Sequence, residues 1–123
     1  MSDTKKILIV DDEQDIVETL KFMLEAQGYD CYCAYDGEAG LNLAKEIIPD
    51  LMILDVMMPK INGYKISRLL TYDNKYKDIP IIMVTARSQD DDKAIGKETG
   101  VNEYITKPFE LDYVISRVNS YFE

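Results

Sequence analysis

The chain has 123 residues, of which 46% are hydrophobic and 30% are charged, a balance typical of one folded domain with a single core. Acidic residues number 23 against 14 basic ones, and the resulting net charge of −9 disfavours direct binding to nucleic acid. The chain contains no histidine, so its chemistry must rely on carboxylates, hydroxyls, lysine and a hard cation rather than on Ser-His pairs, Cys-His pairs or imidazole ligands.

The N-terminal segment, residues 1–6, is polar and leads directly into a short apolar run. It contains neither the apolar core of a signal peptide nor a stretch long enough to span a membrane. We therefore expect a cytoplasmic protein with no membrane partner.

Five short apolar runs alternate with segments of helical periodicity, and no linker or low-complexity segment interrupts them. The runs are residues 7–10, 29–34, 51–54, 79–84 and 103–106. This alternation predicts repeated βα units, and therefore an α/β fold with a doubly wound, five-stranded parallel sheet. The second run contains Cys31 and Cys33, which we interpret as thiols in the core because no second cysteine pair could complete a zinc site.

Helices are predicted between these runs. An apolar stripe after the first run predicts a helix that ends near Gly28. Two more helices are expected, one ending near Pro49 and one beginning near Gly63, and a last helix follows the fifth run. The fourth candidate, residues 91–99, has a thin apolar face and contains Gly96, which costs about 1 kcal/mol relative to alanine inside a helix. We therefore expect the fourth helix to be marginal.

Carboxylates, a hydroxyl and a lysine follow the ends of four predicted strands. These residues are Asp11 and Asp12 after the first, Asp55 after the third, Thr85 after the fourth and Lys107 after the fifth. Each alone could be a helix cap or an ordinary loop residue. Ligands of such sheets bind beyond the carboxyl ends of the strands, so we expect these side chains to share one pocket. Crowded carboxylates repel one another unless a cation neutralises them, and an all-oxygen ligand set favours Mg²⁺.

These residue types predict phosphoryl transfer. A carboxylate beside Mg²⁺ can attack phosphorus and form an aspartyl phosphate. The metal and Lys107 would balance charge on the transferred oxygens, and Thr85 could donate a hydrogen bond to another of them. Because unpaired carboxylates repel, replacing Asp11 or Asp12 with alanine is expected to raise the melting temperature when no metal is bound.

Four blocks of the sequence closely resemble the receiver domain of bacterial response regulators. They are ILIVDDE at 7–13, LDVMMP at 54–59 with an Asn-Gly pair at 62–63, VTA at 84–86 and YITKPF at 104–109. The resemblance extends over essentially the whole chain, so residues 1–123 are expected to form a single receiver domain. It implies a flavodoxin-like (βα)5 fold with strand order 2-1-3-4-5.

The resemblance also implies how the site works. Asp55 would accept a phosphoryl group from a sensor histidine kinase or a histidine phosphotransfer protein. Asp12 and Asp55 would bind Mg²⁺ directly, Asp11 would bind it through water, and Met57 would contribute its backbone carbonyl. Such a domain is not an enzyme acting on a separate substrate, because it catalyses only its own phosphorylation and dephosphorylation.

The same resemblance assigns residues that read the phosphorylated state. Thr85 and Lys107 match the residues that contact the phosphoryl group, and Lys107-Pro108 matches a cis peptide of the family. Tyr104 matches the switch aromatic that reports to the surface formed by the predicted fourth helix (residues 91–99), the fifth strand and the last helix. Met57 and Arg87 occupy positions that tune the rate of dephosphorylation.

The output is expected to be a downstream protein or an output domain, with a phosphorylation-dependent homodimer as a further form. The chain could be a stand-alone receiver or part of a longer regulator. The sequence identifies neither the cognate kinase nor the partner that reads the signal. Tyr72, Tyr76 and Tyr113 are predicted to be exposed and are interpreted as ordinary surface residues.

Three alternative functions remain. The main one is an interaction module on the same scaffold that works without phosphorylation, although such modules commonly lose an acidic or lysine position that this chain keeps. A haloacid-dehalogenase-like phosphatase would need a second aspartate where the chain has Met57. A flavin-binding flavodoxin would need a phosphate-binding loop after the first strand, where Asp11 and Asp12 would repel phosphate.

Overall fold

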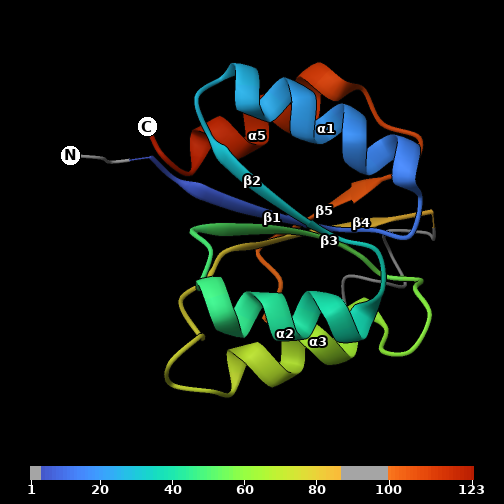
Figure 1. The fold of residues 1–123 in the computed structure, drawn as a ribbon, viewed down its shortest axis with the longest axis vertical. Coiled ribbons are helices and arrows are strands. Elements are labelled where there is room, and N and C mark those ends of the chain that lie inside the picture. Colours follow the sequence, from blue (N-terminus) through green and yellow to red (C-terminus); the bar gives the residue numbers. More distant parts are fainter. Residues whose placement is uncertain (1–3, 87–99) are drawn as a thin grey trace.

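The computed structural model describes residues 4–86 and 100–123, which form a parallel β-sheet between two helical layers (Figure 1). The strands are β1 (Lys6–Val10), β2 (Asp30–Ala34), β3 (Leu51–Asp55), β4 (Ile81–Thr85) and β5 (Glu103–Thr106). They pair in parallel in the order β2-β1-β3-β4-β5. This arrangement confirms the predicted α/β fold, doubly wound and flavodoxin-like.

The described helices cover both faces of the sheet. Helices α1 (Gln14–Ala26) and α5 (Leu111–Ser120) lie on one face, and α2 (Gly37–Ile47) and α3 (Gly63–Thr71) lie on the other (Figure 1). The predicted fourth helix, at 91–99, lies outside the described residues. Within 4–86 and 100–123, no helix combines the length and the apolar character needed to cross a bilayer.

Helix α1 ends at Ala26, near Gly28 as the sequence predicts. Gly28 has a φ of 101°, a left-handed conformation that glycine adopts without strain. Its amide donates a hydrogen bond to the Glu25 carbonyl at 3.0 Å, and the Tyr29 amide donates one to Leu24 at 3.2 Å. These bonds satisfy carbonyls at the end of α1 and turn the chain into β2.

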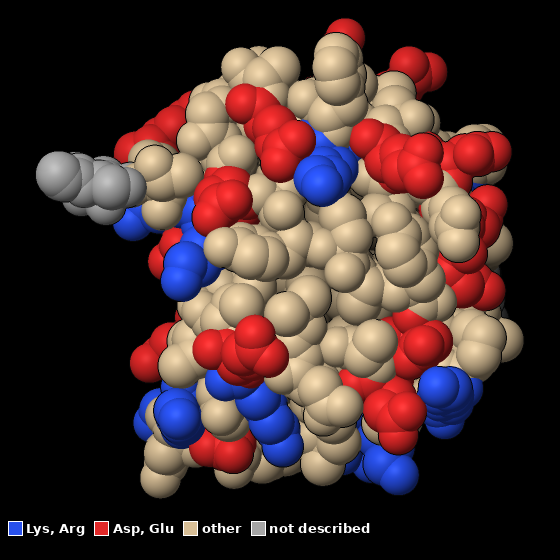
Figure 2. All heavy atoms as spheres, in the orientation of Figure 1, with Lys and Arg blue, Asp and Glu red and all other residues tan. Residues whose placement is uncertain are grey.

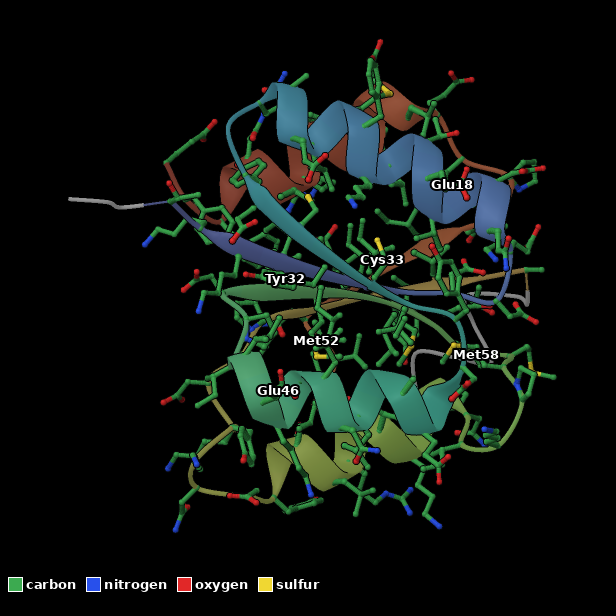
Figure 3. The ribbon with its side chains drawn as sticks, in the orientation of Figure 1. Glu18, Tyr32, Cys33, Glu46, Met52 and Met58 are labelled. Carbon is green, nitrogen blue, oxygen red and sulfur yellow. The ribbon has the colours of Figure 1, made fainter. Side chains whose placement is uncertain are left out.

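The sheet separates two apolar cores, because successive side chains of each strand point to opposite faces. Ile7 and Ile9 of β1 pack toward α1 and α5, whereas Leu8 and Val10 pack toward α2 and α3. Cys33 points toward α1 and Met52 toward α2, as Figure 3 shows. The central strands β3 and β4 are buried along their whole length. The sheet is therefore a rigid platform for the loops that follow its strands.

The two cysteines lie in the core on the α1 side. Cys31 is buried and Cys33 is half-buried, and both are free thiols. Burial, followed by the nearby Glu25 carboxylate, raises the pKa of Cys31 to about 12. A thiol with such a pKa remains protonated and inert at neutral pH, in agreement with the interpretation of both cysteines as core residues.

One surface prediction is wrong. Tyr72 and Tyr113 are exposed, but Tyr76 is only 8% exposed and belongs to the core on the α2 and α3 side. After α3 the chain turns back on itself, with the Tyr76 amide donating to the Asp73 carbonyl at 3.0 Å and Ile79 donating to Tyr76 at 3.1 Å. This turn directs the Tyr76 ring inward, which the sequence pattern does not reveal.

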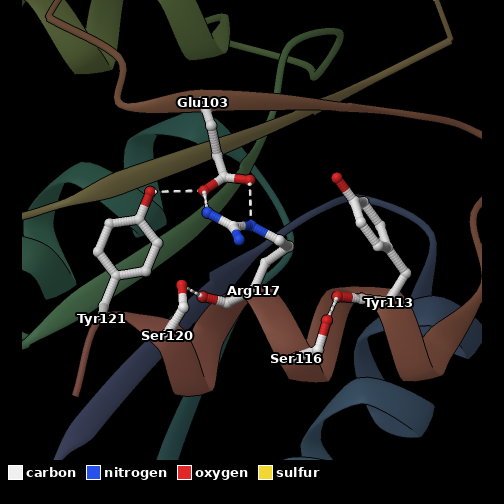
Figure 4. Close-up of polar contacts among 6 residues, drawn as sticks. All are labelled: Glu103, Tyr113, Ser116, Arg117, Ser120 and Tyr121. Carbon is white, nitrogen blue, oxygen red and sulfur yellow. Dashed lines mark hydrogen bonds and ion pairs between the residues drawn. The ribbon is translucent and has the colours of Figure 1, made fainter. Parts of the chain in front are cut away.

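Helix α5 is attached to the edge strand β5 by a polar cluster (Figure 4). The Arg117 guanidinium donates two hydrogen bonds to the Glu103 carboxylate, at 2.9 and 3.0 Å, and the Tyr121 hydroxyl donates a third at 2.7 Å. Burial alone would raise the pKa of Glu103, but these hydrogen bonds outweigh it and lower the pKa. The carboxylate is therefore ionised at neutral pH and fixes the position of α5 relative to the strand.

Candidate functional site

Three carboxylates meet at the carboxyl edge of the sheet. Oxygens of Asp11, Asp12 and Asp55 lie within 4.8 Å of one another. Asp11 is 4% exposed and Asp55 is 5% exposed, whereas Asp12 is exposed to solvent. The sequence thus correctly places these residues together, in a cluster of two buried carboxylates and one, Asp12, that is open to water.

The sheet register explains why the carboxylates meet. Strands β1 and β3 are neighbours, and Val10 pairs with Leu54, so the residues that follow emerge side by side. Asp55 is the last residue of β3 itself, one position earlier relative to the strand end than the sequence predicts. Asp11 is fixed at the end of β1, because its amide donates to the Ala34 carbonyl of β2 at 3.2 Å.

Lys107 reaches these carboxylates from the loop that follows β5. Its Nζ atom lies 2.9 Å from Asp11 Oδ2, 2.7 Å from Glu13 Oε1 and 3.6 Å from Asp55 Oδ2. Its backbone amide donates to the Thr85 carbonyl at 2.8 Å, which ties the loop to β4. The peptide bond between Lys107 and Pro108 is cis, as the resemblance implies.

The Lys107 ammonium is held in its charged form. Burial alone lowers the pKa of Lys107, but hydrogen bonds to Glu13 and Asp11 outweigh burial and raise that pKa above its ordinary value. Sequence reasoning did not assign a role to Glu13. The available signal was its place directly after two aspartates at a strand end, where a third carboxylate can reach the same cation.

The surroundings of Asp55 disfavour its ionised form. Burial, and next the negative charge of Asp11, raise the pKa of Asp55 to about 7, although the Lys107 charge acts in the opposite direction. Asp12 raises the pKa further, and a hydrogen bond from the Met57 backbone lowers it. An added cation would relieve this repulsion. The site therefore fits a hard divalent cation with oxygen ligands, such as Mg²⁺.

The loop after β3 approaches the site closely. Met57 is 61% exposed, so its side chain points away from the core while its backbone contacts Asp55. The Gly63 amide at the start of α3 donates to the Val56 carbonyl at 2.9 Å. A Cβ atom at Gly63 would lie 2.3 Å from the Asp55 carbonyl oxygen, so only glycine allows α3 to begin this close to the acidic pocket.

Thr85 and Tyr104 lie on the neighbouring strands β4 and β5. Thr85 is fully buried at the last position of β4, one residue beyond Val84, which pairs with Asp55. Tyr104 packs against the core on the α2 and α3 side, and its hydroxyl oxygen is buried. The Tyr104 side chain therefore points inward. Arg87, the other position suggested by the resemblance, lies outside the described residues.

An apolar groove opens beside Lys107. It has a volume of about 550 Å³ and lies between α1 and the loop that leads to α5, with Ile16, Phe109 and Leu111 among its lining residues.

On the face shown in Figure 2, acidic side chains lie across both helical layers, and basic side chains are interspersed among them rather than gathered in one patch.

The model of the response regulator receiver domain matches residues 7–119 of this chain. The chain belongs to this family. Receiver domains are signalling modules, and their family typically uses an acidic pocket for Mg²⁺. In this receiver domain the three carboxylates described above form an acidic cluster.

Solved structures of receiver domains superpose closely on this one. The receiver domain of response regulator 1452 from Francisella is 31% identical over 97% of both chains, with a TM-score of 0.88. The chemotaxis response regulator CheY4 of Vibrio cholerae is 29% identical, over 96% of this chain and 98% of its own, with a TM-score of 0.89. The BeF3-activated receiver domain of DrrB, a Thermotoga maritima protein, is 30% identical over 97% of both chains, with a TM-score of 0.87.

Proposed function

We propose that this receiver domain accepts a phosphoryl group on Asp55 in a Mg²⁺-dependent reaction and transmits the change to a partner. The observation that supports this most directly is the set of charged groups around Asp55. Asp55 is a buried carboxylate at a strand end, with two further carboxylates within 4.8 Å and a lysine ammonium at 3.6 Å. A carboxylate so placed can act as a nucleophile toward phosphorus while neighbouring groups balance the charge.

The chemical step is a transfer between two phosphoryl carriers. An Asp55 carboxylate oxygen attacks the phosphorus atom and forms a new P–O bond. The bond from phosphorus to the donor then breaks, and the donor leaves with the bonding electron pair. The donor is a phosphohistidine of a sensor histidine kinase or a histidine phosphotransfer protein, or a small acyl phosphate in its place. Asp55 must be ionised to attack, which a cation in the pocket favours.

The proposed metal ligands are Asp12 and Asp55 directly, Asp11 through water, and the backbone carbonyl of Met57. Mg²⁺ bound there supplies charge neutralisation for the transferring oxygens. The exposure of Asp12 suits this ion, because Mg²⁺ retains several waters when it binds to proteins.

Two further residues of the chain contact the added group in this proposal. The charged Lys107 pairs with a phosphoryl oxygen, and the Thr85 hydroxyl donates a hydrogen bond to another. Movement of Thr85 toward the group would be sensed through β4 and β5, where Tyr104 lies. The signal would leave through the surface formed by the predicted fourth helix (residues 91–99), β5 and α5, to a downstream protein, an output domain or a second copy of the chain. We propose residues 1–123 as a single cytoplasmic receiver.

The decisive experiment is intact-mass spectrometry after incubation with acetyl phosphate. The wild type should gain the mass of one phosphoryl group when Mg²⁺ is present and none when a chelator is added first. Asp55→Asn should not be labelled, whereas Asp50→Asn, a change just before the amino end of β3, should be labelled like the wild type. If the wild type remains unlabelled where a known receiver is labelled, the phosphorylation-independent interaction module becomes the better explanation.

Transmission can be separated from acceptance with two variants. Lys107→Ala and Thr85→Ala keep the nucleophile, so both should still be labelled by acetyl phosphate. Neither should show the change in amide hydrogen exchange that phosphorylation produces around Tyr104 in the wild type. A wild-type exchange response in both variants would contradict the roles proposed for these two side chains.

A further inference from the structure

The Lys107 ammonium is engaged by carboxylates other than the proposed phosphoacceptor. An ammonium carries three N–H donors. One reaches Asp11 Oδ2 at 2.9 Å and another reaches Glu13 Oε1 at 2.7 Å, both lengths of charge-assisted hydrogen bonds. Asp55 Oδ2 lies at 3.6 Å, too far for a hydrogen bond. The ammonium is therefore drawn away from Asp55.

The two carboxylates that hold Lys107 differ in their freedom. The Asp11 side chain is 5% exposed, and its Oδ1 atom accepts a hydrogen bond from the Glu13 amide at 2.9 Å. Its geometry is fixed from two sides. The Glu13 side chain is 57% exposed, and the structure shows no side-chain cap from it to α1, at whose N-terminus it lies. Glu13 can therefore release Lys107 and turn into water at low cost.

We propose that Glu13 is a positioning residue that holds the Lys107 ammonium away from Asp55 until a phosphoryl group is present. The inference rests on the proposed phosphorylation of Asp55 and adds a restraint to it. The new group brings negative oxygens close to Lys107, and the ammonium exchanges its hydrogen bond with Glu13 for one with the phosphoryl group. The Asp11 contact persists in both states. Glu13 thus competes with the phosphoryl group for one donor.

The test measures the affinity of the full chain for beryllium fluoride in the presence of saturating Mg²⁺, followed by ¹⁹F NMR. This probe mimics a phosphoryl group bound to a carboxylate. Glu13→Gln keeps the length of the side chain but removes its charge, so the competing ion pair is lost. We expect affinity to increase about two- to fivefold, the range set by an ion pair with one solvent-exposed partner. Damage to the fold would weaken binding, so tighter binding separates positioning from a structural role.

Two matched variants distinguish the Glu13–Lys107 ion pair from a general effect of negative charge near the start of α1. Glu13→Asp keeps the charge but shortens the side chain by one bond of about 1.5 Å, so it should also bind more tightly. Asp15→Asn removes a charge from the same helix end without touching Lys107, and its affinity should equal that of the wild type. Unchanged affinity in Glu13→Gln, a wild-type result for Glu13→Asp, or equal tightening in Asp15→Asn would overturn the inference. If the wild type itself fails to bind the probe, the proposed function falls, and the inference falls with it.

Discussion

Replacing Asp55 with asparagine should stabilise the metal-free protein, and increasingly so as the pH rises. Asp55 ionises at a pKa of about 7 in the folded protein, against an ordinary value of 3.8, because it is buried beside Asp11 and Asp12. When folding raises the pKa of a carboxyl group, that group contributes its full stabilisation only at pH values below its pKa in the unfolded chain. That contribution is lost as the pH rises toward 7. Asp55→Asn removes the ionisation and therefore the loss.

The magnitude follows from the pKa. Each pH unit of difference corresponds to about 1.4 kcal/mol, so a rise from 3.8 to about 7 corresponds to about 4 kcal/mol of unfolding free energy above pH 8. Water around the exposed Asp12 side chain screens part of the repulsion. We therefore expect the unfolding free energy of Asp55→Asn, relative to that of the wild type, to rise by about 2 to 4 kcal/mol as the pH increases from 4 to 8.

The assay is equilibrium urea unfolding of both proteins with a chelator, at several pH values between about 4 and 8. Asp112→Asn, at the start of α5, controls for the loss of one charge away from the cluster. Addition of Mg²⁺ at pH 8 should reduce the advantage of Asp55→Asn, because the metal stabilises only the protein with the complete ligand set. A difference between Asp55→Asn and the wild type that stays constant over the pH range would refute the reasoning.

Three further perturbations test the site and the fold. Asp12→Ala should weaken Mg²⁺ binding about tenfold or more in calorimetry, and unchanged affinity would defeat its assignment as a ligand. In thermal unfolding without metal, Asp12→Ala should raise the melting temperature by relieving repulsion. Asp11→Ala should instead lower it, because Lys107 loses a buried partner at 2.9 Å; equal shifts would contradict this difference. Glu103→Gln should lower the melting temperature more than Glu110→Gln, because only the Glu103 carboxylate accepts three hydrogen bonds, and equal losses would argue against that cluster.

The expectation for Asp11 changes once its surroundings are known. From the sequence, Asp11 and Asp12 are equivalent members of an acidic pair, and both are expected to destabilise the metal-free protein. In the structure Asp11 is buried and paired with Lys107, whereas Asp12 is exposed. Removing Asp11 abolishes its buried ion pair with Lys107 and the acceptor of the Glu13 amide hydrogen bond, and these losses outweigh the relief of repulsion.

Much of the fold could be predicted from the sequence because the relevant patterns are local. Buried central strands are near-continuous apolar runs, so the run at 51–54 matches β3 (Leu51–Asp55) to within one residue. The fourth run, at 79–84, was predicted to begin two residues earlier than β4 (Ile81–Thr85) does. The strand order came from the family resemblance, since hydrophobic periodicity does not specify which strands become neighbours.

The candidate site was also largely visible in the sequence. The carboxyl ends of parallel strands meet at one edge, so the acids, the hydroxyl and the lysine at four strand ends had to come together there. What the pattern left out is Glu13, which shares Lys107 with Asp11. It also placed Tyr76 on the surface, although a turn after α3 brings that ring into the core.

The sequence by itself therefore determined the succession of strands and helices and the identity of the residues at the sheet edge. Both depend on the spacing of apolar residues and on which residue follows each run. Only the tertiary structure decided which carboxylates hold the Lys107 ammonium, 94 residues from Glu13, and how far the pKa of Asp55 is raised. Burial and distance depend on groups from several strands at once, and neither is encoded in any local stretch of the chain.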